Sequence, residues 1–274
     1  MSSAFSRLLI VIVTVASTAC QAAPLLRVCA DPNNLPWSNQ QQQGFENHIA
    51  SLLANDMGMQ VSYVWYPQGE KFFRKTLNAG VCDVVMGVPS GMEKTATTRP
   101  YYTSSYAFIS RQDRHLAISS LDDPRLRTLK IGVHILSEPE DTLPPVYGLI
   151  SRGLVRNLVG YSIFGNLTEK NPSADLIRAV LNRDVDVAVV WGPLAGYFAR
   201  QSTVPLRVTA IETDPRNPAL PMIFRIAIGV RPQDEALCRR LDAEIARREP
   251  EIHRLLAAYG IPQVSTMPAV QGGN

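Results

Sequence analysis

Cysteine is scarce in this sequence, which has four cysteines in 274 residues. So few cysteines exclude a small scaffold held together by disulfides. Cys20 lies in an N-terminal segment that we expect to be removed, so Cys29, Cys82 and Cys238 remain in the mature chain. Cys29 ends one expected strand and Cys82 begins another, which in neighbouring parallel strands puts their Cα atoms beyond the limit of roughly 7 Å for a disulfide. We therefore expect three free thiols.

Charged residues are few and dispersed. They make up 19% of the sequence, and the formal net charge is +3 at pH 7. No block of Lys or Arg alternates with aromatic residues, so the sequence does not indicate a nucleic acid as a partner.

Signatures of common enzyme classes are also missing. The segment 87–91, Gly-Val-Pro-Ser-Gly, has the wrong spacing for a nucleophile elbow, and the sequence has neither a phosphate loop nor a dinucleotide glycine fingerprint. His48, His115, His134 and His253 show no metal-ligand spacing to one another or to the cysteines. We expect no catalytic residue, no metal and no cofactor.

The N-terminal apolar run is too short to span a membrane. It extends from Leu8 to Ala16, follows Arg7, and leads into small residues that end at Ala23. These features are typical of a secretory signal peptide, which predicts that residues 1–23 are removed and that the mature protein is periplasmic. In an alternative interpretation the protein is a lipoprotein acylated at Cys20, although Ser17 stands where such signals usually have an aliphatic residue.

Short apolar runs alternate with amphipathic segments in the first third of the mature chain. The apolar runs predict strands, and the residues between them have the spacing of helices that end at Gly58 and Gly80. The order strand, helix, strand, helix, strand is typical of a parallel sheet. The predicted strands are Leu25–Ala30, Val61–Tyr66 and Val84–Met86.

The same pattern recurs further along the chain, which predicts two lobes. Asp-Val-Val-Met-Gly at 83–87 is echoed by Asp-Val-Ala-Val-Val-Trp-Gly at 186–192, and the run Met222–Val230 predicts a strand that returns to the first lobe before two final helices. We predict an α/β protein with mixed, mostly parallel sheets, helices on both faces and a hinge of two crossovers. Its parts are a first lobe of residues 24–110 and 222–264, a second lobe of residues 111–221, and a tail of residues 265–274.

Polar and aromatic residues follow several of these strands at their carboxyl ends, where open α/β sheets bind ligands. Gly87, Pro89 and Gly91 mark a loop at the end of one strand, and Gly192 and Pro193 break another. The residues that we expect to face the cleft between the lobes are Asp31, Trp37, Ser90, Tyr102 and Trp191.

Six motifs between Leu26 and Val264 carry a family resemblance. They are CADPNNLPWSN (29–39), GFENHIA (44–50), AGVCDVVMGVPSG (79–91), TTRPYY (97–102), DVAVVWGPLAGYFA (186–199) and YGIP (259–262). Together they resemble the quinoprotein dehydrogenase-associated solute-binding proteins, the MoxJ/XoxJ group of the type II periplasmic binding protein superfamily. The resemblance implies a two-lobed fold and a non-catalytic periplasmic helper of a PQQ-dependent methanol or alcohol dehydrogenase, which works alongside a c-type cytochrome.

The sequence departs from the amino-acid receptors of that superfamily. Those receptors commonly place an Arg after the third strand to pair with the ligand carboxylate, whereas no Arg occurs here between Asp83 and Arg99. Trp191 stands where they usually carry an Asp for the ligand ammonium, and Asp31 matches a ligand-facing Asp. We therefore do not expect zwitterion binding.

Two further functions remain open from the sequence. One is a solute receptor that delivers a small polar ligand to an ABC transporter. The other is a periplasmic dehydratase that uses a glutamate of the cleft as general acid, for which Glu46 and Glu93 are candidates by residue type.

Overall fold

The computed structural model describes residues 23–136, 142–164 and 171–264. The predicted signal peptide, apart from its last residue, and the predicted tail lie outside them. Ten strands form one sheet in the order β4-β1-β5-β12-β7-β10-β8-β9, with β6 paired to β12 and β11 paired to β7. The short strands β2 (Asn33–Asn34) and β3 (Ser38–Asn39) pair separately.

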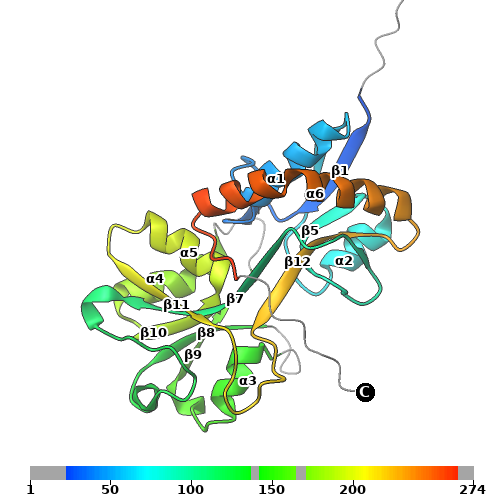
Figure 1. The fold of residues 1–274 in the computed structure, drawn as a ribbon. Coiled ribbons are helices and arrows are strands. Elements are labelled where there is room, and N and C mark those ends of the chain that lie inside the picture. Colours follow the sequence, from blue (N-terminus) through cyan, green and yellow to red (C-terminus); the bar gives the residue numbers. More distant parts are fainter. Residues whose placement is uncertain (1–22, 137–141, 165–170, 265–274) are drawn as a thin grey trace, which may run out of the picture.

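Two bodies of the molecule are joined by β7 and β12, which run side by side between them (Figure 1). We call β1–β6, β12, α1, α2 and α6 the first lobe, and β8–β11 with α3–α5 the second lobe; β7 extends through both. The residue boundaries of the lobes predicted from the sequence stay a prediction.

The first lobe is built around β1 (Leu25–Ala30). This strand pairs in parallel with β4 (Gln60–Trp65) and with β5 (Val84–Pro89). Because side chains alternate along a strand, Val28 and Val84 face one core while Cys29 and Val85 face another.

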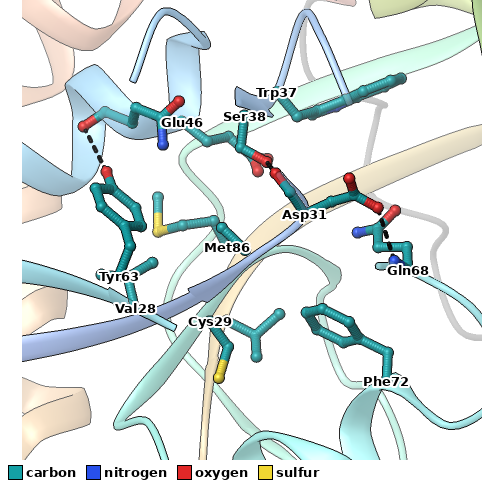
Figure 2. A pocket seen from close by; sticks show the side chains of 13 residues that line it. Val28, Cys29, Asp31, Trp37, Ser38, Glu46, Tyr63, Gln68, Phe72 and Met86 are labelled. Carbon is teal, nitrogen blue, oxygen red and sulfur yellow. Dashed lines mark hydrogen bonds between the residues drawn. The ribbon is translucent and has the colours of Figure 1, made fainter. Parts of the chain in front are cut away.

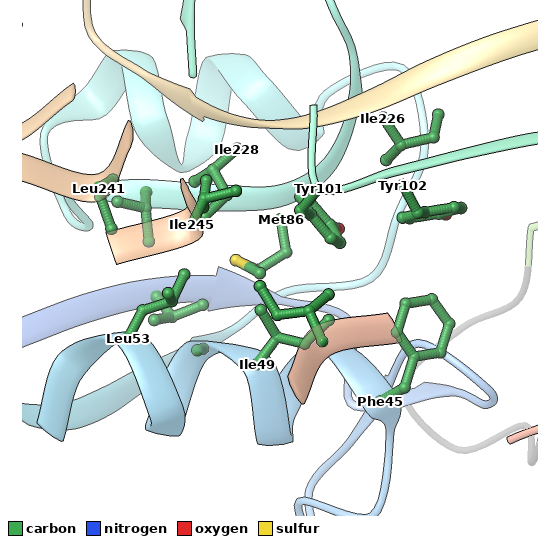
Figure 3. Packing of buried hydrophobic residues seen from close by; sticks show 14 of the residues in the cluster. Phe45, Ile49, Leu53, Met86, Tyr101, Tyr102, Ile226, Ile228, Leu241 and Ile245 are labelled. Carbon is green, nitrogen blue, oxygen red and sulfur yellow. The ribbon is translucent and has the colours of Figure 1, made fainter. Parts of the chain in front are cut away.

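Helices cover both faces of this part of the sheet. α1 (Phe45–Asp56) packs on the larger core, where Figure 3 shows Ile49 opposite Met86 and Tyr101. α2 (Phe72–Lys75) and η1 (Leu77–Ala79) cover the other face. β6 (Ala96–Thr97) then leads to the crossover.

The expectation of three free thiols is wrong, because Cys29 and Cys82 form a disulfide with their Cα atoms 5.6 Å apart. Cys82 precedes β5, which begins at Val84, so it is not held in the register of the strand. The chain arrives there from η1 on the face of the sheet to which Cys29 points, and both cysteines belong to the small core on that face. Within the described chain Cys238 is the free cysteine.

The two crossing strands share a short antiparallel segment. β7 (Tyr102–Arg111) pairs through Tyr102 to Ser105 with β12 (Ile223–Val230), which also pairs with β5. From Tyr106 onward β7 pairs instead with strands of the second lobe. β7 is therefore one continuous element that extends from the first core into the second.

The second lobe continues the sheet beyond β7. β10 (Val187–Trp191) lies antiparallel to β7 and parallel to β8 (Ile131–Ile135), which pairs with β9 (Leu158–Ser162). β11 (Leu206–Ile211) pairs with β7. Four short 3-10 turns lie between the elements: η2 (Gln112–Arg114), η3 (Pro124–Arg127), η4 (Val155–Asn157) and η5 (Pro172–Ala174).

Helices also cover both faces of the second lobe. α4 (Asp175–Asn182) and α5 (Gly192–Gln201) pack on one face, and α3 (Pro144–Ile150) packs on the other. The apolar side chains of α4 lie on one face of the helix, and four of its residues are buried.

The prediction of two final helices is wrong, because one helix, α6 (Glu235–Ala258), extends past Pro250. The buried residues Leu241, Ile245, Ile252 and Leu256 keep helical spacing across the proline, so a single apolar face rests on the first core. Although α6 has 24 residues, neither it nor another helix in the described part of the chain is long and apolar enough to cross a membrane.

Candidate functional site

A cavity of about 440 Å³ lies between the lobes, at the carboxyl ends of β5 and β10. Both lobes and both crossing strands contribute to its wall. The lining residues are Asn34, Trp37, Glu46, Gln68, Gly87, Pro89, Tyr102, Tyr106, His134, Leu143, Pro145, Val146, Ile163, Phe164, Val189, Val190, Trp191 and Ile226.

Three of the predicted site residues meet in this wall. Trp37 comes from the loop after β1, Tyr102 begins β7, and Trp191 ends β10. The Tyr102 hydroxyl interacts with both indoles, which acts against the rise in its pKa that burial causes. Trp191 also makes an edge contact with Tyr106, at 5.3 Å between ring centroids. Aromatic rings from both lobes therefore line one side of the cleft.

The other two predicted site residues lie elsewhere. The Asp31 carboxylate accepts hydrogen bonds from the backbone N–H groups of Asn33 and Gln68, both at 2.7 Å. Figure 2 shows Asp31 turned toward Gln68. Burial raises the pKa of Asp31, and the two backbone N–H groups act against that rise. Asp31 thus holds together two loops beside the cleft.

Ser90 directly follows β5 and is half-buried. Its backbone N–H donates to the carbonyl of Arg225 at 2.8 Å. Ser90 does not belong to the set of side chains that lines the cavity.

Glu46 is the most unusual group of the cleft. It is 7% exposed and accepts a hydrogen bond of 2.8 Å from the Tyr101 hydroxyl, which in turn accepts one from the Gly87 backbone N–H. A Cβ atom at Gly87 would lie 2.6 Å from Glu46 Oε1, and φ is +74° at this position, so a side chain here would displace the carboxyl and strain the backbone. Burial raises the pKa of Glu46 to about 7 even though the Tyr101 hydroxyl stabilises the ionised form.

From the sequence, Glu46 is a candidate acid of a dehydratase by residue type only. The spacing of Glu46 relative to nearby apolar residues gives a stronger indication that it is buried. Glu46, Ala50 and Leu53 recur at intervals of four and three residues, which places them on one helical face, and all three are buried. A carboxyl on the apolar face of a helix is a candidate functional group.

The remaining polar groups of the cleft are neutral. His134 is buried, and its Nε2 atom lies 3.1 Å from the carbonyl oxygen of Ser173. Burial lowers the pKa of His134 to about 4. Asn34 and Gln68 contribute amides. None of the described residues that line the cavity is Arg or Lys. The described lining can therefore accept neutral or aromatic groups, but it offers a carboxylate no Arg or Lys as a partner.

Contacts between the lobes flank the cleft. The Leu35 backbone N–H donates to Asn171 Oδ1 at 2.7 Å. α5 lies close to the turn after α6, where a Cβ atom at Gly196 would be 2.0 Å from the carbonyl oxygen of Gly260. Among the described residues no group of three or more His, Cys, Asp or Glu could hold a metal ion.

The sequence profile of the bacterial extracellular solute-binding proteins, family 3, matches residues 26–260. The chain belongs to this family. Solute-binding proteins of this kind are generally non-catalytic.

Several members of the solute-binding family are similar over most of this chain. Protein MoxJ of Methylorubrum extorquens is 30% identical over 253 residues, which cover 90% of this chain and 84% of that protein. The structure of the periplasmic binding protein XoxJ from Methylobacterium extorquens AM1 aligns with a TM-score of 0.72 at 31% identity, covering 88% of this chain and 100% of XoxJ. MxaJ from Methylophaga aminisulfidivorans MPT aligns with a TM-score of 0.73 at 26% identity, covering 87% and 100%.

These comparisons confirm two predictions from the sequence. The α/β periplasmic binding protein fold with mixed, mostly parallel sheets is confirmed, and so is the resemblance to the MoxJ/XoxJ group. The places of Asp31, Trp37, Ser90, Tyr102 and Trp191 in ligand binding stay a prediction.

Proposed function

We propose that this protein is a non-catalytic periplasmic accessory protein that binds a PQQ-dependent alcohol or methanol dehydrogenase and assists its assembly or activation. The similarity to MoxJ and XoxJ supports the choice of partner. A c-type cytochrome is the second expected partner, because the resemblance to that group implies one.

The observation that carries the proposal is the described lining of the cleft, which contains neither Arg nor Lys. A receptor for an amino acid must replace the water around two opposite charges, and leaving either charge unpaired in a closed site costs several kcal/mol. This cleft offers no Arg or Lys from the described residues, and the pKa of its one carboxyl is raised to about 7. Within the described lining, an amino acid therefore finds no usual partner for its carboxylate.

Co-purification from the periplasm of the source organism tests the proposal. Tagged protein is expected to recover a quinoprotein dehydrogenase, identified by mass spectrometry and by dye-linked alcohol oxidation in the eluate. A family 3 amino-acid receptor with the same tag serves as the control. Recovery of a permease and its ATPase without a dehydrogenase would contradict the proposal.

The second candidate function is that of a receptor for a small polar ligand of an ABC transporter. It is favoured by the size of the cavity, because about 440 Å³ lies within the range of roughly 300–1,000 Å³ of small-molecule sites. Neighbouring genes separate the two: a dehydrogenase and a cytochrome c favour the accessory protein, whereas a permease and an ATPase favour the receptor.

A further inference from the structure

A short stretch of the second lobe exposes an unusual amount of apolar surface. Six large apolar side chains of the described residues are at least 41% exposed, and three of them, Tyr147, Ile150 and Val155, lie within 147–155. They are 53%, 41% and 57% exposed. Isolated apolar residues on a surface are ordinary, whereas a concentration of them marks an interaction site.

This stretch comprises α3 and the turn into η4, at the lower end of the second lobe in Figure 1. Its inner side is well packed, because Val146, Leu149 and Leu154 belong to the second-lobe core. The outward apolar residues therefore are not left over from an incomplete core.

A buried ion pair holds α3 in place. The side chains of Arg152 and Asp214 are 2% and 1% exposed, and Arg152 Nη1 lies 3.0 Å from Asp214 Oδ2. The same Nη1 atom donates to the Gly148 carbonyl at 2.8 Å, and Nε donates to Asp122 at 3.0 Å. A buried pair contributes little net stability compared with apolar packing, but removing one partner is costly, so such a pair mainly fixes geometry.

Among the residues that the structure describes around this stretch, the unpaired charges belong to two arginines. Arg156 follows Val155, and Arg127 lies close by, since its carbonyl accepts a hydrogen bond of 2.9 Å from Asn157 Nδ2. Both arginines are exposed, and neither guanidinium forms an ion pair or hydrogen bond with another described residue. Of the nearby acids that the structure describes, Asp122 pairs with Arg152 and Arg216, and Asp123 pairs with Arg125; Glu138, Glu140 and Asp141, which precede α3 in the sequence, lie outside the described residues.

We propose that Tyr147, Ile150 and Val155, with Arg127 and Arg156 at their rim, form a docking surface for a folded protein whose contact region is apolar at its centre and acidic at its edge. Tyrosine and arginine are among the residues that contribute most to protein interfaces. Complementary charge at the rim speeds association and selects the partner. The proposal rests on the proposed function, in which that partner is the quinoprotein dehydrogenase.

A membrane surface fits this stretch less well. α3 has seven residues and includes neither Lys nor Arg, whereas helices that lie in a membrane interface combine a long apolar face with a basic one. A rigidly held short helix is better suited to a shaped protein surface.

Binding of the purified dehydrogenase to the mature protein, measured by biolayer interferometry at two salt concentrations, tests the docking surface. Tyr147→Ser combined with Ile150→Ser is expected to weaken binding at least about tenfold. Arg156→Glu is expected to slow association and to reduce its dependence on salt. Leu25→Ser and Arg74→Glu are matched controls, because Leu25 is 52% exposed and Arg74 is an exposed arginine, and both lie on the first lobe.

The outcomes separate the docking surface from the proposed function. If the wild-type protein binds and the folded surface variants bind equally well, the docking surface is wrong and the accessory function stands. If the wild-type protein does not bind the dehydrogenase, both are wrong. If the same variants instead lose binding to anionic vesicles or self-association in solution, the surface does not serve to bind the dehydrogenase. Circular dichroism and melting temperatures establish that each variant is folded.

Discussion

At the scale of single residues, Glu46 should make stability depend on pH. Its pKa rises from an ordinary 4.5 to about 7 on folding. Folding is therefore favoured while the carboxyl is protonated, and this contribution is complete below pH 4.5 and is lost as the pH rises through about 7. The loss amounts to roughly 3 kcal/mol.

Glu46→Gln removes the titrating group and keeps an acceptor for the Tyr101 hydroxyl. As the pH rises from 4 to 8, the unfolding free energy of the variant is expected to increase by roughly 3 kcal/mol relative to that of the wild type. Urea unfolding at several pH values measures this gain. The other carboxyl groups titrate in both proteins and cancel in the comparison, so parallel pH profiles would contradict the buried, protonated state.

The disulfide between Cys29 and Cys82 should stabilise the mature protein. It closes a loop with a sequence separation of 53 residues. Chain entropy predicts a loss of roughly 4 kcal/mol in the double variant Cys29→Ala and Cys82→Ala, measured by urea unfolding. Cys238→Ser is the control, since this half-buried thiol is free, and little change is expected. Thiol titration of the denatured, unreduced protein should find one thiol per mature chain, and three would exclude the disulfide.

At the scale of elements, the contact between α5 and the turn after α6 should not tolerate a side chain. At Gly196 a Cβ atom would meet the Gly260 carbonyl, which belongs to the backbone and cannot rotate away as a side chain would. Gly196→Ala is expected to cost roughly 1–3 kcal/mol in unfolding free energy. It should also widen the cleft, which small-angle X-ray scattering detects as a larger radius of gyration.

Gly69→Ala is the matched control for that substitution, because no atom lies within 4 Å of its added Cβ. Its effect is expected to stay within about 0.5 kcal/mol. Equal stability of the two variants would mean that α5 does not hold the lobes together at this point.

At the scale of the whole molecule, common amino acids should neither close nor stabilise the protein. A ligand present at about 100 times its dissociation constant adds roughly 2.7 kcal/mol, which raises the melting temperature of a protein of this size by several degrees. A thermal-shift screen of amino acids at millimolar concentration is therefore expected to show no such rise. One clear, saturable shift would contradict this and favour the receptor. If the screen does find such a ligand, small-angle X-ray scattering with and without it would test the predicted hinge motion.

The sequence by itself determined the order and type of most elements. The strand Leu25–Ala30 was predicted with its observed bounds, and the return strand near 222–230 was placed within one residue. Periodicity and turn residues act over a few positions, so they can be read without knowing what the element contacts. The same local reasoning placed Trp191 at a strand end and Trp37 in the loop after the first strand, and both line the cleft.

Only the tertiary structure decided the features that depend on residues far apart in the chain. The disulfide arises because the segment before β5 comes down onto the face of the sheet to which Cys29 points. Asp31 binds the backbone of Gln68 from another loop, and Glu46 is buried because Tyr101 and Gly87 close over it. The distance between two thiols and the hydration of one carboxyl depend on packing, which no short window of sequence contains.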